Sequence, residues 1–213
     1  HYGSGMLSPY GEQMLFVAEY CAKTGYDLNK KDMFGKMKDW FHTFGGRPDH
    51  ALLTAVKDCE MDEAYCTGSK DDQAHCFTKA VVVTCLYFGS PRRHQMVEEV
   101  IRAHQEHDTA VSIGLALSNI LNSLLNGSTL AEALSEKNIL DGVKSSSVQE
   151  AVKDAYIAKG KPLELTAAER GRSCHLPEAF IIPLQAALAV ADENGDTNGD
   201  GSSYASAIRE NIL

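Results

Sequence analysis

The sequence predicts an all-α protein that folds as one helical domain over residues 1–213. Three observations lead to this prediction. Apolar residues recur three and four positions apart in segment after segment, which places them on one face of a helix. No segment alternates apolar and polar residues as a half-buried strand does. Capping residues, glycines and prolines separate the periodic segments, where helices begin and end.

In the N-terminal half, the pattern predicts an apolar helix over 14–22 that Gly25 ends, and an amphipathic helix over 32–44. The Gly-Gly-Arg-Pro run at 45–48 breaks the chain before a short helix at 49–58. A polar, acidic loop follows, and two more helices are expected at 73–88 and 92–105.

In the C-terminal half, Asp108 or Thr109 is expected to cap a helix that stops at Asn126-Gly127, and Ser128 begins a capping-box pattern. The remaining segments are a Ser-rich connector at 140–150, a helix at 148–158, a charged loop or short helix at 164–173 and an apolar central helix at 177–190 that Pro183 kinks or breaks. A low-complexity Asp/Asn/Gly stretch at 192–203 and a last helix at 204–213 follow.

Composition excludes several classes of protein. A formal net charge of −9 argues against binding to duplex nucleic acid, whose phosphates require clusters of Lys and Arg. No apolar run reaches the roughly 20 residues of a membrane span. The chain begins at His1 without an initiator Met and ends at Leu213 inside an expected helix, so we expect a segment of a longer protein, truncated at both ends.

The six cysteines form no Cys-x-x-Cys pair, and most lie among apolar neighbours. Cys59, Cys66, His75 and Cys76 provide zinc-capable groups, but their spacing departs from that of zinc sites. Free buried thiols are therefore the favoured interpretation, and they indicate an intracellular, reducing compartment.

Two polar clusters are candidate sites. The run at 196–201 imitates the start of a calcium-binding loop, but the twelfth position would be Ala207, where a bidentate carboxylate is needed; a solvated linker is favoured. His104, His107 and Asp108 stand at a helix boundary, where they can bind a cation, hold a sugar hydroxyl or transfer protons. A solvated helix end with Asp108 as the cap is the more frequent role of such residues.

Several segments together resemble the ADP-ribosylglycohydrolase family, most closely its J-type crystallin branch. The similarity is carried by Gln73-Ala74-His75-Cys76-Phe77-Thr78-Lys79, by Ala103-His104-Gln105-Glu106-His107-Asp108-Thr109-Ala110-Val111, and by the shorter runs 10–13, 46–50, 84–87 and 205–212. The resemblance implies an orthogonal all-helical bundle. It also implies that active members hold two magnesium ions in a central cleft and hydrolyse the bond between ADP-ribose and a protein side chain, N-glycosidic or O-linked.

The sequence departs from the family pattern at the metal ligands. Where active members carry Thr-Asp-Asp-Thr, this chain has Tyr10-Gly11-Glu12-Gln13, so Glu12 is the candidate metal ligand and catalytic carboxylate. The second motif, Asp-x-Asp-Thr, would follow the helix that ends at Leu213, and the run at 195–200 resembles it only in composition. Tyr10, His104, His107 and Asp108 are the candidate ligand-binding residues.

Three interpretations follow. The favoured one is a catalytically impaired relative, a pseudoenzyme that serves as a structural or accessory subunit and needs no cofactor. The alternative is a magnesium-dependent hydrolase that removes ADP-ribose. The third is an ADP-ribose binder without turnover, in which Tyr10 or Phe77 stacks on the base. The expected partners are ADP-ribose and other protein subunits, with no nucleic acid and no membrane span.

Overall fold

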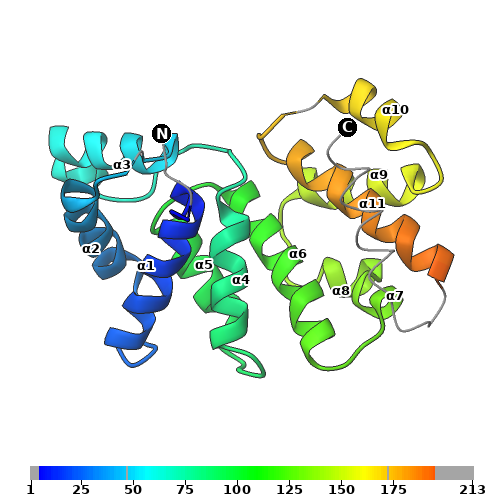
Figure 1. The fold of residues 1–213 in the computed structure, drawn as a ribbon, viewed down its shortest axis with the longest axis horizontal. Helices are drawn as coiled ribbons and strands as arrows, with labels where there is room; N and C mark the ends of the chain where they lie inside the picture. Colours follow the sequence, from blue (N-terminus) through cyan, green and yellow to red (C-terminus); the bar gives the residue numbers. More distant parts are fainter. Residues whose placement is uncertain (1–4, 47, 172, 195–213) are drawn as a thin grey trace.

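In a computed structural model, residues 5–46, 48–171 and 173–194 are described, and they are helical with short connections (Figure 1). The elements are α1 (Pro9–Lys23), α2 (Lys30–Thr43), α3 (His50–Met61), a 3₁₀ turn η1 (Glu63–Tyr65), α4 (Cys76–Leu86), α5 (Arg93–Arg102), α6 (Asp108–Leu125), α7 (Leu130–Ala133), α8 (Glu136–Ile139), α9 (Ser146–Ala158), α10 (Leu163–Arg170) and α11 (Glu178–Asn194).

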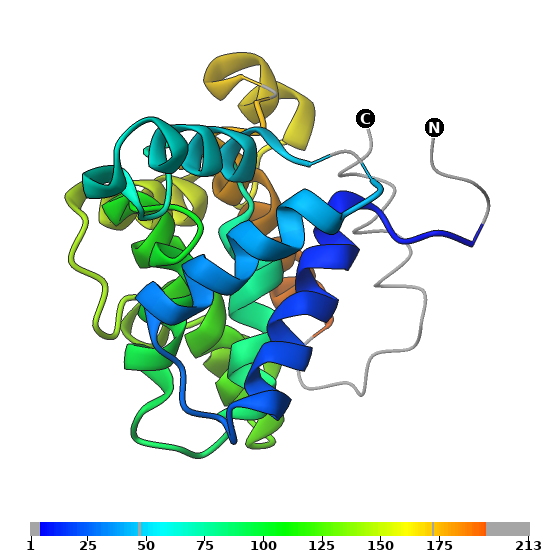
Figure 2. The same cartoon turned by 90° about the vertical axis from the view of Figure 1, so that its left-hand side faces the viewer.

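The prediction of an all-α fold is confirmed. Within the described ranges no strand forms, and the only β-type pairings are the isolated bridges Ser69–Gln105 and Gln73–His175. The helices cross at steep angles: α3 lies crosswise to α1 in Figure 1, and α1 and α2 are steeply inclined to each other in Figure 2. The calcium-like run and the expected last helix lie outside the described residues.

Polar side chains start several of the helices. Asn29 Oδ1 accepts from the backbone N–H groups of Lys31 and Asp32, at 3.0 Å each, and begins α2. Two predicted caps are wrong. His107, and not Asp108 or Thr109, is the N-cap of α6, and its side chain makes no capping hydrogen bond. Thr129, not Ser128, forms the capping box with Glu132. The Thr129 hydroxyl can accept from the Glu132 N–H because its backbone is extended at the cap.

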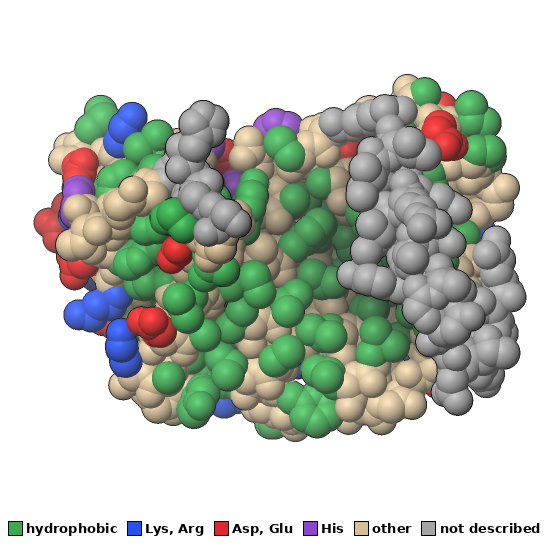
Figure 3. All heavy atoms as spheres, viewed as in Figure 1, with side chains coloured by type: hydrophobic (Ala, Val, Ile, Leu, Met, Phe, Trp, Pro, Cys, Tyr) green, Lys and Arg blue, Asp and Glu red, His purple; other side chains and the backbone are tan. Residues whose placement is uncertain are grey.

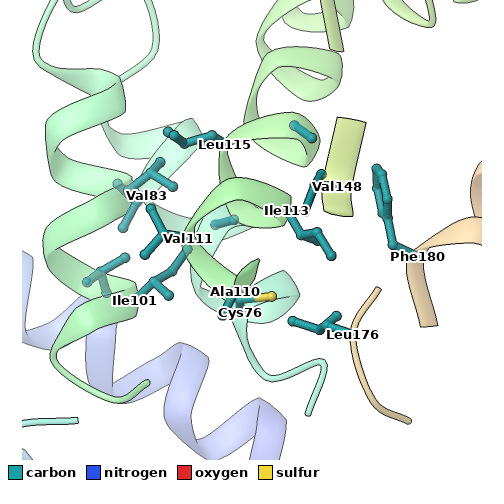
Figure 4. Close-up of a cluster of buried hydrophobic side chains, with 14 of the residues drawn as sticks. Cys76, Val83, Ile101, Ala110, Val111, Ile113, Leu115, Val148, Leu176 and Phe180 are labelled. Carbon is teal, nitrogen blue, oxygen red and sulfur yellow. The ribbon is translucent and has the colours of Figure 1, made fainter. Parts of the chain in front are cut away.

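The helix α6 is the centre of the core. It packs most extensively on α4 and also on α5, α8, α7 and α9. Figure 4 shows Val83 of α4 and Ile101 of α5 on one side of α6, with Val148 of α9 and Phe180 of α11 on the other. By length and composition alone α6 is long and apolar enough to cross a membrane, and 56% of it is buried inside the protein.

The helix α11 completes the second half of the bundle. It packs against α9 and α10, and it continues through Pro183 rather than ending there. Proline removes one backbone donor, so a helix tolerates it where packing on both sides compensates for the lost hydrogen bond. The buried residues Phe180, Ile181 and Leu184 provide that packing.

The prediction of free thiols is wrong for one pair of cysteines. Cys59, at the end of α3, forms a disulfide with Cys66, seven residues later and just after η1. Cys21 and Cys76 are free and buried, as predicted, whereas Cys85 and Cys174 are free and exposed. The spacing gave no signal for the pair, because the turn at η1 brings the two residues together.

Hydrophobic side chains gather on one face of the molecule, over α1, α4 and α6 (Figure 3). Several of the residues on these helices and the loop after α4 are large and at least one-third exposed: Leu15, Leu86, Phe88, Leu124 and Leu125. Large apolar areas at a protein surface mark contacts with other molecules more often than isolated exposed residues do.

Candidate functional site

A buried polar cluster lies where α1, α3, α4 and the corner between α5 and α6 meet. Its centre is Asp49, the N-cap of α3, whose Oδ1 accepts from the backbone N–H of Leu52 at 2.9 Å. The carboxylate also accepts from Gln13 Nε2 of α1 and from His104 Nε2 at 3.1 Å. His75 Nε2 lies 3.6 Å from Oδ1. One carboxylate thus joins four segments that are distant in the sequence.

Lys79 provides the positive charge of this cluster. Its side chain has no solvent exposure, and its Nζ donates to Gln13 Oε1 at 2.6 Å and to the carbonyl of His75 at 3.5 Å. The amide of Gln13 therefore bridges the ammonium of Lys79 and the carboxylate of Asp49. Lysine is almost never fully buried unless it is paired, and here the pairing runs through Gln13 and the field of Asp49.

The histidines contact the carboxylate through the same ring atom. Because His104 Nε2 faces Asp49, and His75 Nε2 faces Gln73 Oε1 at 3.0 Å, the hydrogen-bond pattern assigns the proton to Nε2 in both rings. Each Nδ1 is then a bare acceptor, and neither has a hydrogen-bond partner among the described residues. The rings of His75 and His104 meet edge to face, with centroids 5.4 Å apart.

Burial determines the charges in the cluster. It lowers the pKa of His75 to about 4 and also lowers the pKa of His104, despite the opposing effect of Asp49. It lowers the pKa of Lys79 to about 8 against the attraction of Asp49, so the ammonium stays protonated at neutral pH. Burial opposes ionisation of Asp49 as well, but the hydrogen bond from His104 and the charge of Lys79 outweigh it, and the pKa of Asp49 falls well below its ordinary value. One carboxylate and one ammonium thus face each other among neutral histidines.

Backbone contacts fix the position of His104. Its carbonyl accepts from the N–H of Ser69, and Gln105 Nε2 donates to the carbonyls of Asp71 and Gln73 at 3.0 and 2.7 Å. This close approach requires Gly68, because a Cβ there would lie 2.5 Å from the carbonyl oxygen of Arg102. The segment 68–73 is therefore bound to the α5–α6 corner, and it brings the start of α4 to the cluster.

Tyr10 forms the outer wall of the cluster. Its ring stacks on His75 with centroids 5.1 Å apart and stays 43% exposed, so one face is buried and the other reaches solvent. Two histidine–carboxylate contacts involve the segment just before α4: His50 Nδ1 lies 2.7 Å from Asp71, and His175 contacts Asp72. The arrangement gives an aromatic surface at the entrance to a buried, charge-balanced interior.

Of the residues that the sequence predicted, Tyr10 and His104 come together through His75. His104 is fully buried and bonded to Asp49. Glu12, one residue before Gln13, is partly buried, and its carboxylate makes no hydrogen bond or ion pair with any described residue. His107 is the N-cap of α6, and its Nδ1 is buried without a partner.

Asp108 lies in a different place, at the edge of a surface groove. Its carboxylate accepts from Arg102 Nη2 at 2.7 Å, which, with the charge of Arg102, lowers its pKa although the side chain is 87% exposed. The groove has a volume of about 770 Å³, and Arg102, Glu98 and Lys144 are among the residues that line it. Charges of both signs alternate along it, so it presents no net field for an anion.

Sequence reasoning missed Asp49, Lys79 and Gln13 as site residues. Asp49 is recognisable as a cap, but a cap is usually exposed, and only the packing of His104 buries this one. A signal existed for Lys79. Its position in the apolar run of α4 leaves no solvent-facing side, since Cys76 and Val83 occupy the same buried face.

The described residues do not fit a magnesium site. Mg²⁺ needs carboxylates that remain free to coordinate it. No group of three or more His, Cys, Asp or Glu side chains in the described ranges is arranged to hold a metal ion. Asp49, Asp71 and Asp72 are each engaged by a protein side chain, which leaves Glu12 as the isolated carboxylate.

The fold is an all-helical bundle that encloses a polar cluster between its first helices. A comparison with known families identifies the family that has this fold. The family model described as ADP-ribosylglycohydrolase matches residues 1–213. The chain therefore belongs to the ADP-ribosylglycohydrolase family. No curated protein and no solved structure matches it.

Proposed function

We propose that this member of the ADP-ribosylglycohydrolase family is catalytically impaired and serves as a structural or accessory subunit. One observation carries the proposal. At the start of α1, where active members are expected to hold two adjacent acidic ligands, only Glu12 is acidic, and Gln13 is bonded to Asp49 and Lys79. A glutamine brings no negative charge to a metal ion, and this one already directs its carbonyl oxygen at the ammonium of Lys79.

The interior of the cluster also opposes a divalent cation. Lys79 is fixed beside Gln13, and Coulomb repulsion between a second cation and a buried ammonium is weakly screened at such a site. The ligand set therefore supports a protein in which the polar cluster stabilises the fold. No chemical step is derived through magnesium.

The apolar face over α1, α4 and α6 supports the role of a subunit (Figure 3). Leu15, Leu86 and Phe88 are 47%, 37% and 46% exposed. Aromatic and aliphatic side chains at this exposure supply the anchors of protein interfaces. A place near the J-type crystallins, whose fold has bulk structural use, agrees with this role and stays a prediction. An intracellular location also stays a prediction, and the Cys59–Cys66 disulfide weighs against a reducing compartment.

The alternative is a magnesium-dependent hydrolase that removes ADP-ribose from modified proteins. One feature favours it. Glu12 is unpaired among the described residues, and Tyr10, two positions earlier in α1, exposes a ring face that has the chemistry of a stacking platform for adenine or ribose. That hydrolase would need carboxylates from outside the described residues, and a binder without turnover would need only the platform.

Isothermal titration of ADP-ribose, with and without Mg²⁺, tests these roles, together with a hydrolysis assay on ADP-ribosylated protein. We expect no hydrolysis and no magnesium-dependent binding. The matched variants are Glu12→Ala and, as a control on the same helix, the exposed Glu19→Ala. Hydrolysis that Glu12→Ala abolishes and Glu19→Ala leaves intact would refute the proposal. Binding without hydrolysis, lost in Tyr10→Ala, would establish the binder.

A further inference from the structure

A lysine and an aspartate share one buried cluster with two histidines, and the carboxylate of Asp71 also acts on both histidine rings. Lys79 has no exposed surface and Asp49 is 9% exposed. An isolated ammonium or carboxylate in such a place loses its hydration and is unstable unless an opposite charge and hydrogen bonds compensate. The two groups therefore depend on each other, although the amide of Gln13 stands between them.

The shape of the cluster fits an ammonium group closely. The stem of Lys79 lies on the buried face of α4, between Cys76 and Val83, and only its Nζ reaches polar atoms. Gln13 Oε1 accepts from Nζ while Gln13 Nε2 donates to Asp49, so the amide transmits the polarity of one charge to the other. The carboxylate of Asp49 is thus the anionic centre of the cluster, and the ammonium of Lys79 is already present as the cation that balances it.

We propose that the Lys79 ammonium is the resident cation of this cluster, and that it supplies from within the chain the positive charge that an acidic site otherwise takes from a bound ion. Truncated at this position, the protein would become a receptor for a small primary ammonium ion. The inference rests on the proposed function, since a protein that does not depend on a catalytic metal is free to hold a lysine here.

A double-mutant cycle tests the dependence of the two charges. Lys79→Met keeps most of the stem volume and removes the charge, and Asp49→Asn keeps a good helix cap. We expect Lys79→Met to lower Tm by an amount on the order of 10 °C, because it leaves a buried carboxylate unpaired. Adding Asp49→Asn should recover about half of that loss. Losses that simply add would overturn the proposal.

Chemical rescue tests the ammonium itself. Lys79→Ala removes three carbons and the nitrogen, which is the outline of n-propylammonium. At about ten times its dissociation constant, this guest should raise the Tm of Lys79→Ala by about 3–5 °C. Rescue of the same size by 1-propanol would overturn the proposal, because it would assign the loss to volume rather than charge.

A control variant on the surface completes the experiment. Lys153→Met, at an exposed position of α9, should leave Tm within about 1 °C of the wild type and respond to no guest. If Lys79→Ala does not fold, the Lys79→Met cycle still decides the question. Hydrolysis of ADP-ribosylated protein by the wild type would refute the proposed function, but it would leave the rescue and the cycle to be judged on their own results.

Discussion

Acidification should unfold this protein through His75. The pKa of His75 falls to about 4 in the folded state, whereas an exposed histidine titrates near 6.5. Between these values the unfolded chain binds a proton that the folded chain refuses, so stability is lost as the pH falls from 6.5 towards 4. The two pKa values give a loss of about 2 kcal/mol between pH 7 and pH 5 from His75 alone. His104, whose pKa burial also lowers, adds to the loss.

Urea denaturation followed by circular dichroism at several pH values between 5 and 7 measures this loss. In His75→Gln, which cannot take up the proton, the difference in unfolding free energy between pH 7 and pH 5 should shrink by about 2 kcal/mol. His42→Gln is the matched control, because the same substitution is made there at a ring that is half exposed and lies outside the cluster. An unchanged slope in His75→Gln would show that this ring is already charged, or already open to water, in the folded protein.

Two further predictions concern packing and the disulfide. Gly114→Ala should destabilise the protein by about 1–3 kcal/mol, because its Cβ would meet Ile101 Cδ1 at 2.1 Å, whereas Gly35→Ala, with open space around it, should stabilise α2 by up to ~1 kcal/mol; thermal denaturation compares them. Cys59→Ser, which breaks the bond to Cys66, should cost on the order of 2 kcal/mol, and dithiothreitol should lower the Tm of the wild type to that of the variant. A Tm of Gly114→Ala equal to or above that of the wild type would contradict the first expectation. A Tm of the wild type that dithiothreitol does not change would contradict the second.

The helical class and most helices could be predicted from the sequence because their causes are local. Capping residues and apolar spacing lie within a few positions of the helix that they specify. The helix α6 is found almost to the residue for this reason. The charged segment before Ser173 was ambiguous between loop and helix, and it forms α10, since Leu163 and Ala167 find a partner in α11. Because α11 lies outside this segment, the local pattern of the segment does not predict the contact between them.

The polar cluster could be predicted only in part, because its contacts are not local. The resemblance to a family pointed to His104 and to the start of α1. It gave no reason to connect Asp49 with His104, which a hydrogen bond joins across 55 positions. The charge of Lys79 was also misleading, since lysine usually lies at the surface, and only the packing of α1 on α4 encloses it.

The bridge that Gln13 makes has a consequence for the order in which the chain folds. Its hydrogen bonds join residues 36 and 66 positions apart, so they form only after long loops have closed. Such contacts are usually absent from the rate-limiting transition state. Substitutions at Gln13 should therefore accelerate unfolding and leave the rate of folding nearly unchanged. The cluster would then set the lifetime of the folded protein, while the apolar contacts of α4, α5 and α6 set the speed with which it is reached.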